Sequence, residues 1–271
     1  MLTPAAFRKI VLSHYKAKGR HDLPWRYTTN PYHILVSELM LQQTQVARVL
    51  PKYKAFLTKF PNIETLSKAP LESVLSLWVG LGYNRRAKYL KEAASAVVAK
   101  GGVFPQTEEA LRLLPGVGPY TASALMAFAF DTTTVMIETN IRTVFLFHFY
   151  KNKKEKVSDK EILDLVAKTL PRAGFRSWYY ALMDYGAFLK REQGSHNKQS
   201  LTYKKQSVFN GSNRQIRGAI IRVLTKSISP QGTKDFRRAV DTTNEKLEAQ
   251  LTTLIKDGLI EKHGTEYKLA T

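Results

Sequence analysis

Two glycines separated by one residue constrain the fold of this chain more than any other feature. They lie in the run Leu114-Pro115-Gly116-Val117-Gly118-Pro119-Tyr120, between a helix-like stretch at 107–113 and an apolar helix-like stretch at 121–130. The backbone must therefore turn tightly between two helices. This pattern is typical of a helix-hairpin-helix, in which N–H groups at the start of the second helix bind a DNA phosphate. Taken alone, the glycines also fit an ordinary turn between helices.

The charge of the chain favours a polyanionic partner. Its 42 Lys and Arg against 22 Asp and Glu give a formal net charge of +20 over 271 residues, which suits nucleic acid or an anionic membrane surface. No apolar run approaches the ~18 residues that a membrane-spanning helix needs. Residues 1–20 show an amphipathic helical pattern and no secretory-signal core. We expect an intracellular monomer, in the cytoplasm or nucleoid, without membrane association.

The sequence contains no cysteine. This excludes disulfides, a thiol nucleophile and a thiolate-ligated iron–sulfur cluster. The six histidines show no metal-ligand spacing, so no metal site is expected. The one ion that we consider is a monovalent cation at the hairpin 114–118, and no other cofactor is expected.

Helix-like patterns dominate the chain. From Val46 to Ala99 they follow one another, with breaks at Phe60-Pro61-Asn62, Ala69-Pro70 and Gly80-Leu81-Gly82, and strand-like alternation is scarce. Thr3 to Lys18 also has apolar residues at helical spacing. We therefore predict an all-α fold for this part of the chain.

Two glutamates are candidates for acid–base chemistry. Glu38 is followed by three apolar residues within a strong helix candidate, so it either points into a cleft or lies on the exposed side of a packed helix. Glu138 precedes Thr139 and Asn140, either of which can cap a new helix and leave Glu138 near its positive end, where a carboxylate stays ionised. The chain between Gly118 and Glu138 is long enough for one helix and a return. Both carboxylates could then converge on one cleft.

A tyrosine and two arginines follow the glycine turn at 80–82. Tyr83, Arg85 and Arg86 could wedge into a base stack and hold phosphates. A helix cap with solvated arginines explains the same residues equally well.

Residues 23 to about 190 resemble the helix-hairpin-helix base-excision DNA glycosylases, and the pattern is closest to the MutY-type adenine DNA glycosylases. The string Leu-Gln-Gln-Thr-Gln at 41–45 favours this branch over the endonuclease III and thymine-mismatch branches. The motifs that carry the resemblance are Leu23-Pro24-Trp25-Arg26, Ser37-Glu38-Leu39-Met40-Leu41-Gln42-Gln43-Thr44-Gln45, Leu77-Trp78-Val79-Gly80-Leu81-Gly82-Tyr83, Leu114-Pro115-Gly116-Val117-Gly118 and Met183-Asp184-Tyr185-Gly186-Ala187.

The resemblance implies a two-lobed helical domain with two catalytic carboxylates. Removing a base from an extruded nucleotide requires a proton on the leaving purine and a negative charge near the oxocarbenium-like sugar. Glu38 matches the family's general acid, which protonates adenine at N7. Glu138 stands where the family has an aspartate that stabilises the sugar cation or forms a transient bond to it.

The resemblance also implies contacts with DNA. Gln42, Gln43 and Tyr83 match residues that fill or wedge the space left by the flipped base, and Arg26 matches a position beside the base pocket. Tyr120 stands where endonuclease III-type enzymes have a Schiff-base lysine, which implies a monofunctional enzyme without strand cutting. The residues expected to contact substrate or DNA are Arg26, Gln42, Gln43, Tyr83, Arg85, Arg86, Gly116, Gly118, Tyr120, Asn140 and Arg142.

The chain departs from the family pattern at three points. Glu138 is one methylene longer than the usual aspartate. Lys190 to His196 replaces the usual four-cysteine iron–sulfur loop and has no thiol. A C-terminal domain of the kind that recognises 8-oxoguanine is not found in the sequence.

The C-terminal part has a different pattern from the rest of the chain. Residues 190–217 are rich in Lys, Arg and small polar residues, a composition that suits a flexible tether or a segment lying along phosphates. Three helix-like stretches and an alternating stretch follow, which predict a small winged-helix-like (α+β) domain, although a packing or dimerisation module fits as well. We expect a glycosylase domain at 1–190 (a six-helix lobe at about 24–136 and a second lobe from 1–23 and 137–190), a basic linker at 191–213 and the winged-helix-like domain at 214–271.

The sequence leaves two classes of function open. One is a monofunctional glycosylase of base excision repair that removes adenine mispaired with guanine or 8-oxoguanine, with thymine or uracil opposite guanine as a narrower variant. The other is a non-catalytic DNA-binding protein. Glu38 favours the enzyme, because binding alone needs no buried acid. In either case the expected partner is double-stranded DNA with a mismatched or damaged base pair.

Overall fold

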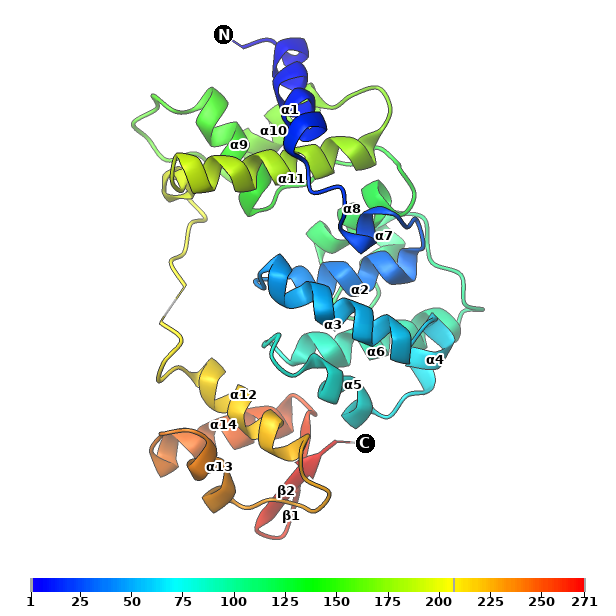
Figure 1. Ribbon diagram of the computed structural model, residues 1–271, viewed down its shortest axis with the longest axis vertical. Helices are drawn as coiled ribbons and strands as arrows, with labels where there is room; N and C mark the ends of the chain where they lie inside the picture. Colours follow the sequence, from blue (N-terminus) through cyan, green and yellow to red (C-terminus); the bar gives the residue numbers. More distant parts are fainter. Residues whose placement is uncertain (1, 207, 271) are drawn as a thin grey trace. The chain divides into compact units, whose positions relative to one another are not determined.

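The computed structural model describes residues 2–206 and 208–270 (Figure 1). These residues form two compact units, each assembled from separate stretches of the chain. The domain boundaries expected from the sequence stay a prediction. The first unit comprises the residues up to 34, 105–112 and 117–205, and the second comprises 35–104, 113–116 and the residues from 206 onward.

The first unit is helical and is centred on aromatic side chains. The ring centroid of Phe7 lies 5.1 Å from that of Phe145 and 5.9 Å from that of Trp178, and all three side chains are buried. These residues come from α1 (Pro4–Lys18), α9 (Thr139–Phe149) and α11 (Phe175–Glu192). The core therefore joins the N-terminal helix to two long helices near the end of the unit. Its elements are α1 (Pro4–Lys18), η1 (Pro24–Arg26), α7 (Glu108–Leu111), α8 (Pro119–Phe128), α9 (Thr139–Phe149), α10 (Asp159–Thr169), α11 (Phe175–Glu192) and η2 (His196–Gln199).

The second unit contains a bundle of helices in its N-terminal part. Phe56 and Trp78 are both fully buried there, and their ring centroids lie 6.2 Å apart. Asn62 caps α4 by accepting a hydrogen bond from the Thr65 N–H, and α4 packs along α6. The helices are α2 (Pro31–Leu41), whose first turn belongs to the first unit, α3 (Val46–Lys59), α4 (Ile63–Lys68), α5 (Leu71–Trp78) and α6 (Arg85–Val98).

The C-terminal part of the second unit consists of three helices and a β-hairpin, as the sequence predicts. α12 (Asn213–Leu224) packs against α13 (Thr233–Ala239) and α14 (Asn244–Lys256). β1 (Ile260–His263) and β2 (Glu266–Leu269) pair antiparallel in a two-stranded sheet. Phe236 and Tyr267 are buried, and their ring centroids lie 5.9 Å apart, so the hairpin closes over α13. This arrangement confirms the expected fold class, a helical protein with a small winged-helix-like (α+β) part.

The helix-hairpin-helix predicted from the glycines is formed by α7, the turn at residues 114–118 and α8. Gly116 has a φ of 74°, and a Cβ at this position would lie 2.6 Å from the Tyr89 Cβ. Only glycine fits such a turn without strain. Gly118 is the N-cap of α8, with φ −84° and ψ 179°, and Pro119 occupies the first helical position. The two glycines therefore have different roles: Gly116 forms the turn, and Gly118 begins the helix.

Within residues 2–206 and 208–270, no helix is long and apolar enough to span a membrane.

Candidate active site

Glu38 lies on α2 and is almost completely buried. Its exposed fraction is 6%, and the flanking Ser37 and Leu39 are buried as well. The alternative of a solvated surface glutamate is therefore excluded. A buried carboxyl group has a definite position, which a proton donor requires.

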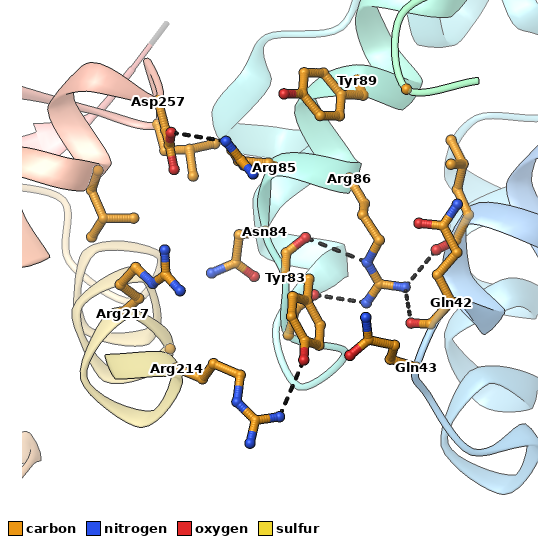
Figure 2. A pocket seen from close by; sticks show the side chains of 16 residues that line it. Gln42, Gln43, Tyr83, Asn84, Arg85, Arg86, Tyr89, Arg214, Arg217 and Asp257 are labelled. Carbon is orange, nitrogen blue, oxygen red and sulfur yellow. Dashed lines mark hydrogen bonds and ion pairs between the residues drawn. The ribbon is translucent and has the colours of Figure 1, made fainter. Parts of the chain in front are cut away.

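Arg86, the second residue of α6, connects the end of α2 to the glycine turn. Its Nη1 donates to the carbonyl oxygens of Leu39 at 2.5 Å and Gln42 at 2.7 Å, and its Nη2 donates to that of Gly82 at 2.8 Å (Figure 2). Burial lowers the pKa of Arg86 to about 10, although the nearby Tyr83 raises it. With 6% exposure, the guanidinium is enclosed by main-chain acceptors. Arg86 is therefore not a solvated arginine, which was one of the two alternatives that the sequence left open.

Gln43 and Tyr83 adopt left-handed backbone conformations on either side of this network. Their φ angles are 55° and 49°, which are rare for residues with side chains. Arg86 holds the carbonyl of Gln42 and the carbonyl of Tyr83, the latter at 3.4 Å, so its guanidinium fixes the backbone at both places. Such strained positions, kept in place by a buried arginine, are common at functional sites.

One cavity brings together all of the expected DNA-contacting residues of the second unit. Its volume is about 390 Å³. Gln42, Gln43 and Tyr83 line it together with Arg85 and Arg86 (Figure 2). Gly116 of the hairpin also lies in its wall.

Glu138 lies in the first unit and is itself the N-cap of α9. Its Oε1 accepts hydrogen bonds from the N–H groups of Asn140 at 2.7 Å and Ile141 at 2.8 Å. The prediction that Thr139 or Asn140 would cap this helix was wrong, because the longer glutamate side chain folds back onto the first turn. Burial raises the pKa of Glu138 above its usual value of 4.5, although these hydrogen bonds and Arg142 lower it.

Two neighbouring segments fix the first turn of α9. A Cβ added to Gly186 on α11 would overlap the carbonyl oxygen of Asn140, so the two helices touch through their backbones. The Asn197 side chain on η2 donates to the Thr139 carbonyl at 3.2 Å and to the Thr143 hydroxyl at 3.0 Å. These contacts hold the turn that carries Glu138.

Arg26 forms an ion pair with Asp184 of α11. Its Nη1 and Nη2 donate to the two carboxylate oxygens at 2.6 Å and 2.8 Å, and its guanidinium carbon lies 4.6 Å from the centre of the Tyr180 ring. Although burial raises the pKa of Asp184, the hydrogen bonds from Arg26 lower it below the usual carboxyl value. The Arg26 side chain is 5% exposed, so this pair fixes the segment that follows α1.

The remaining expected contacts lie at helix starts. Tyr120 is the second residue of α8, next to the Gly118 cap. Arg142 on α9 pairs with Asp159, with Nε–Oδ1 and Nη2–Oδ2 distances of 2.9 Å. Glu38 and Glu138 belong to different units, and their convergence on one cleft stays a prediction.

Sequence reasoning missed the positioning residues. Asp184 and Gly186 lie in the motif Met183-Asp184-Tyr185-Gly186-Ala187, but the sequence indicated no role for either residue. An acidic residue among apolar neighbours and a glycine inside a helix-like stretch are the sequence signals that could have identified them. Asn197 lies in a polar, basic segment and carried no such signal.

The described residues contain no group of three or more His, Cys, Asp or Glu side chains that could hold a metal ion. The chain also lacks the four thiolates that an iron–sulfur cluster would need, because the sequence has no cysteine. The residues present therefore do not fit the cluster that is usual in the resembling family. The monovalent cation at the hairpin stays a prediction.

Known proteins match this chain in sequence and in structure. The family model of the HhH-GPD superfamily base excision DNA repair proteins matches residues 36–171. An adenine DNA glycosylase of Buchnera aphidicola is 37% identical over 69% of this chain and 54% of its own length. One from Mycolicibacterium smegmatis is 32% identical over 90% of this chain and 89% of its own.

A solved structure of a thermostable thymine-DNA glycosylase is 28% identical, with a TM-score of 0.61, and the match covers 72% of this chain and 91% of that one. The chain spans about half the length of the Buchnera relative, at 54%. The family match covers half of the sequence and includes the part of α2 that carries Glu38, the hairpin and Glu138. The chain therefore belongs to the HhH-GPD superfamily of base excision DNA repair proteins.

Proposed function

We propose that this protein is a monofunctional DNA glycosylase that hydrolyses the N-glycosidic bond of adenine mispaired with guanine or 8-oxoguanine. The observation that carries the proposal is the burial of Glu38, a carboxyl group on the helix that ends at the Gln42-Gln43 pair. Binding DNA does not by itself require a buried acid at this position. The similarity to adenine DNA glycosylases along most of the chain supports adenine as the base.

Glu38 acts as the general acid. Its carboxyl proton passes to N7 of the extruded adenine, and the bond between C1′ and N9 breaks with its electron pair leaving on the base. Protonation makes adenine a neutral leaving group. The sugar is left as an oxocarbenium ion, which water attacks at C1′. The proton released from this water returns the Glu38 carboxylate to its acid form.

Glu138 stabilises that cation. Its ionised carboxylate has a fixed position because two backbone N–H groups of α9 bind it. A preorganised charge of this kind needs no rearrangement as the sugar becomes positive. The contacts of Gly186 and Asn197 with the first turn of α9 make these residues positioning residues for the reaction.

Double-stranded DNA is held by the hairpin and by the cavity of the second unit. The start of α8, with Gly118 and Tyr120, offers backbone N–H groups to a phosphate. Gln42, Gln43 and Tyr83 fill the space left by the flipped nucleotide, and Arg86 fixes their backbone. We assign Arg26, Asn140 and Arg142 to the DNA interface as well, and we propose that the protein acts as a monomer.

Strand cleavage is not part of this activity. A lyase reaction needs an amine that attacks C1′ and forms a Schiff base. Tyr120 offers a phenol at the position where endonuclease III-type enzymes have a lysine. The expected product is therefore an abasic site in an intact strand.

Thymine or uracil opposite guanine is a second candidate substrate. The 28% identity to a thymine-DNA glycosylase over 91% of that structure favours it. A pyrimidine has no N7, so Glu38 would then have to act on a carbonyl oxygen or through water.

A panel of duplexes tests the proposal. The protein is incubated with duplexes that carry adenine, thymine or uracil opposite guanine or 8-oxoguanine, and alkali then cuts each abasic site. Cleavage confined to the adenine strands supports the proposal, and cleavage of thymine or uracil strands alone supports the second candidate. Binding without base release from any duplex would mean that the protein is not a glycosylase for these substrates.

A further inference from the structure

The cavity beside Tyr83 has a second wall, which comes from the C-terminal part of the same unit. Arg214, Arg217 and Gly218 of α12 line it, together with Asp257 after α14 (Figure 2). Neither the proposed chemistry nor the family match at 36–171 involves these residues. The cavity is therefore formed partly by the glycosylase fold and partly by the winged-helix-like part.

Positive charge dominates the side chains around this cavity. Arg85, Arg86, Arg214 and Arg217 line it, whereas Asp257 is the only acidic residue among its lining side chains. Asp257 lies 3.4 Å from the Arg85 guanidinium, a long distance for an ion pair. One carboxylate cannot neutralise four guanidinium groups in a shared space, so the cavity attracts an anion.

The hydroxyl group of Tyr83 connects the two walls. It accepts hydrogen bonds from the Gln206 side chain at 2.9 Å and from the Arg214 guanidinium at 3.2 Å. The guanidinium carbon of Arg214 also lies 5.8 Å from the centre of the Tyr83 ring. Any anion that Arg214 binds must therefore lie next to the tip of the tyrosine ring.

We propose that this cavity binds a phosphate of the DNA strand next to the Tyr83 wedge, through Arg214 and Arg217 of α12. Guanidinium groups bind phosphate oxygens through paired N–H donors, which matches two arginines one helical turn apart. A strand that Tyr83 contacts brings its own phosphates close to this tyrosine side chain. The winged-helix-like part thus belongs to the DNA-binding site. This inference rests on the proposed function, because it takes DNA as the ligand.

The experiment measures DNA affinity as a function of salt. Arg214→Ala/Arg217→Ala is compared with the wild type and with Arg222→Ala/Arg237→Ala, which removes the same charge from α12 and α13 outside the cavity. Each protein is titrated with a fully paired duplex between low and moderate salt. Thermal unfolding confirms that all variants are folded. Because the duplex needs no base removal, the result is independent of whether the protein excises adenine.

Loss of one phosphate contact should reduce the slope of log K against log salt concentration by about 0.9. We expect this reduction in Arg214→Ala/Arg217→Ala and a wild-type slope in the control variant. Equal reductions in both variants would show that overall charge matters and the cavity does not, and an unchanged slope in both would also overturn the proposal.

A second titration with inorganic phosphate at constant ionic strength separates a free anion from DNA. Saturable binding of phosphate by the wild type, combined with an unchanged DNA slope in Arg214→Ala/Arg217→Ala, would assign the cavity to a free anion and overturn the DNA assignment. A reduced DNA slope supports the proposal, whether or not phosphate alone binds.

Discussion

Gly186 of α11 touches the backbone of α9 so closely that a Cβ at Gly186 would overlap the carbonyl oxygen of Asn140. Asn140 donates its N–H to the Glu138 carboxylate at 2.7 Å. The position of the Glu138 charge therefore depends on the absence of a side chain on another helix.

Gly186→Ala should move the first turn of α9 and Glu138 with it. Overpacking of this kind costs about 1–3 kcal/mol of unfolding free energy, and base release should slow in the folded variant. Gly218→Ala is a matched control for stability alone, because an added Cβ meets no other atom and helix propensity favours alanine by roughly 0.5–1 kcal/mol. Its rate of base release is not used as a control, because Gly218 lines the cavity proposed to bind DNA. Urea unfolding and single-turnover rates measure both effects. A Gly186→Ala variant as stable and as active as the wild type would contradict the positioning role.

The two hairpin glycines should respond differently to alanine. Gly116→Ala places a Cβ at a φ of 74° and 2.6 Å from the Tyr89 Cβ, so it should destabilise the fold by more than about 1 kcal/mol. Gly118→Ala meets open space, and its unfolding free energy should stay within about 0.5 kcal/mol of the wild type. Its DNA affinity should nevertheless fall, because the methyl group occupies the approach of the phosphate. Thermal unfolding and DNA titration test the pair, and wild-type DNA affinity in Gly118→Ala would remove the hairpin from the interface.

Glu138→Gln should change how stability depends on pH. Burial raises the pKa of Glu138 in the folded state, so the folded protein binds this proton more tightly than the unfolded chain does. Protonation of Glu138 therefore stabilises the fold. This stabilisation is lost as the pH rises from 4.5 through the raised pKa. Glutamine keeps an oxygen for the two N–H groups of α9 and carries no charge. The variant should therefore become more stable than the wild type as the pH rises above this window, and the difference should vanish at low pH. Melting temperatures across the pH range test this, and a wild type that gains stability over the variant with rising pH would be the opposite result.

Because position 120 holds a tyrosine and not a lysine, the expected product is an abasic site in an uncut strand. Without a Schiff-base amine, borohydride should trap no covalent complex with DNA, and strands should break only after alkali or heat. An endonuclease III-type enzyme that carries the lysine serves as the positive control for trapping. Efficient trapping of this protein would mean that another amine attacks the sugar.

Local features of the sequence predicted much of the fold. Gly116 and Gly118 located the hairpin because a tight turn between helices needs glycine, and apolar spacing located the helices and the C-terminal β-hairpin. The burial of Glu38 was one of two alternatives, which its apolar neighbours left open. These features depend on residues close together in the chain.

Long-range partners could not be predicted in this way. Arg26 and Asp184 are far apart in sequence, and nothing near either residue indicates the pair. Arg86 looked like a surface arginine because its acceptors are main-chain carbonyls, which any sequence provides. Glu138 was not expected as a cap because shorter polar residues usually fill that position.

The most direct test of the account is the rate of base release by Glu38→Gln. Single-turnover reactions with adenine opposite 8-oxoguanine compare this variant with the wild type, and DNA titration shows whether the substrate is still bound. If Glu38 donates the proton, the rate should fall by about 10²-fold or more while DNA affinity is kept. A Glu38→Gln variant that binds the duplex and releases adenine at the wild-type rate would contradict the account.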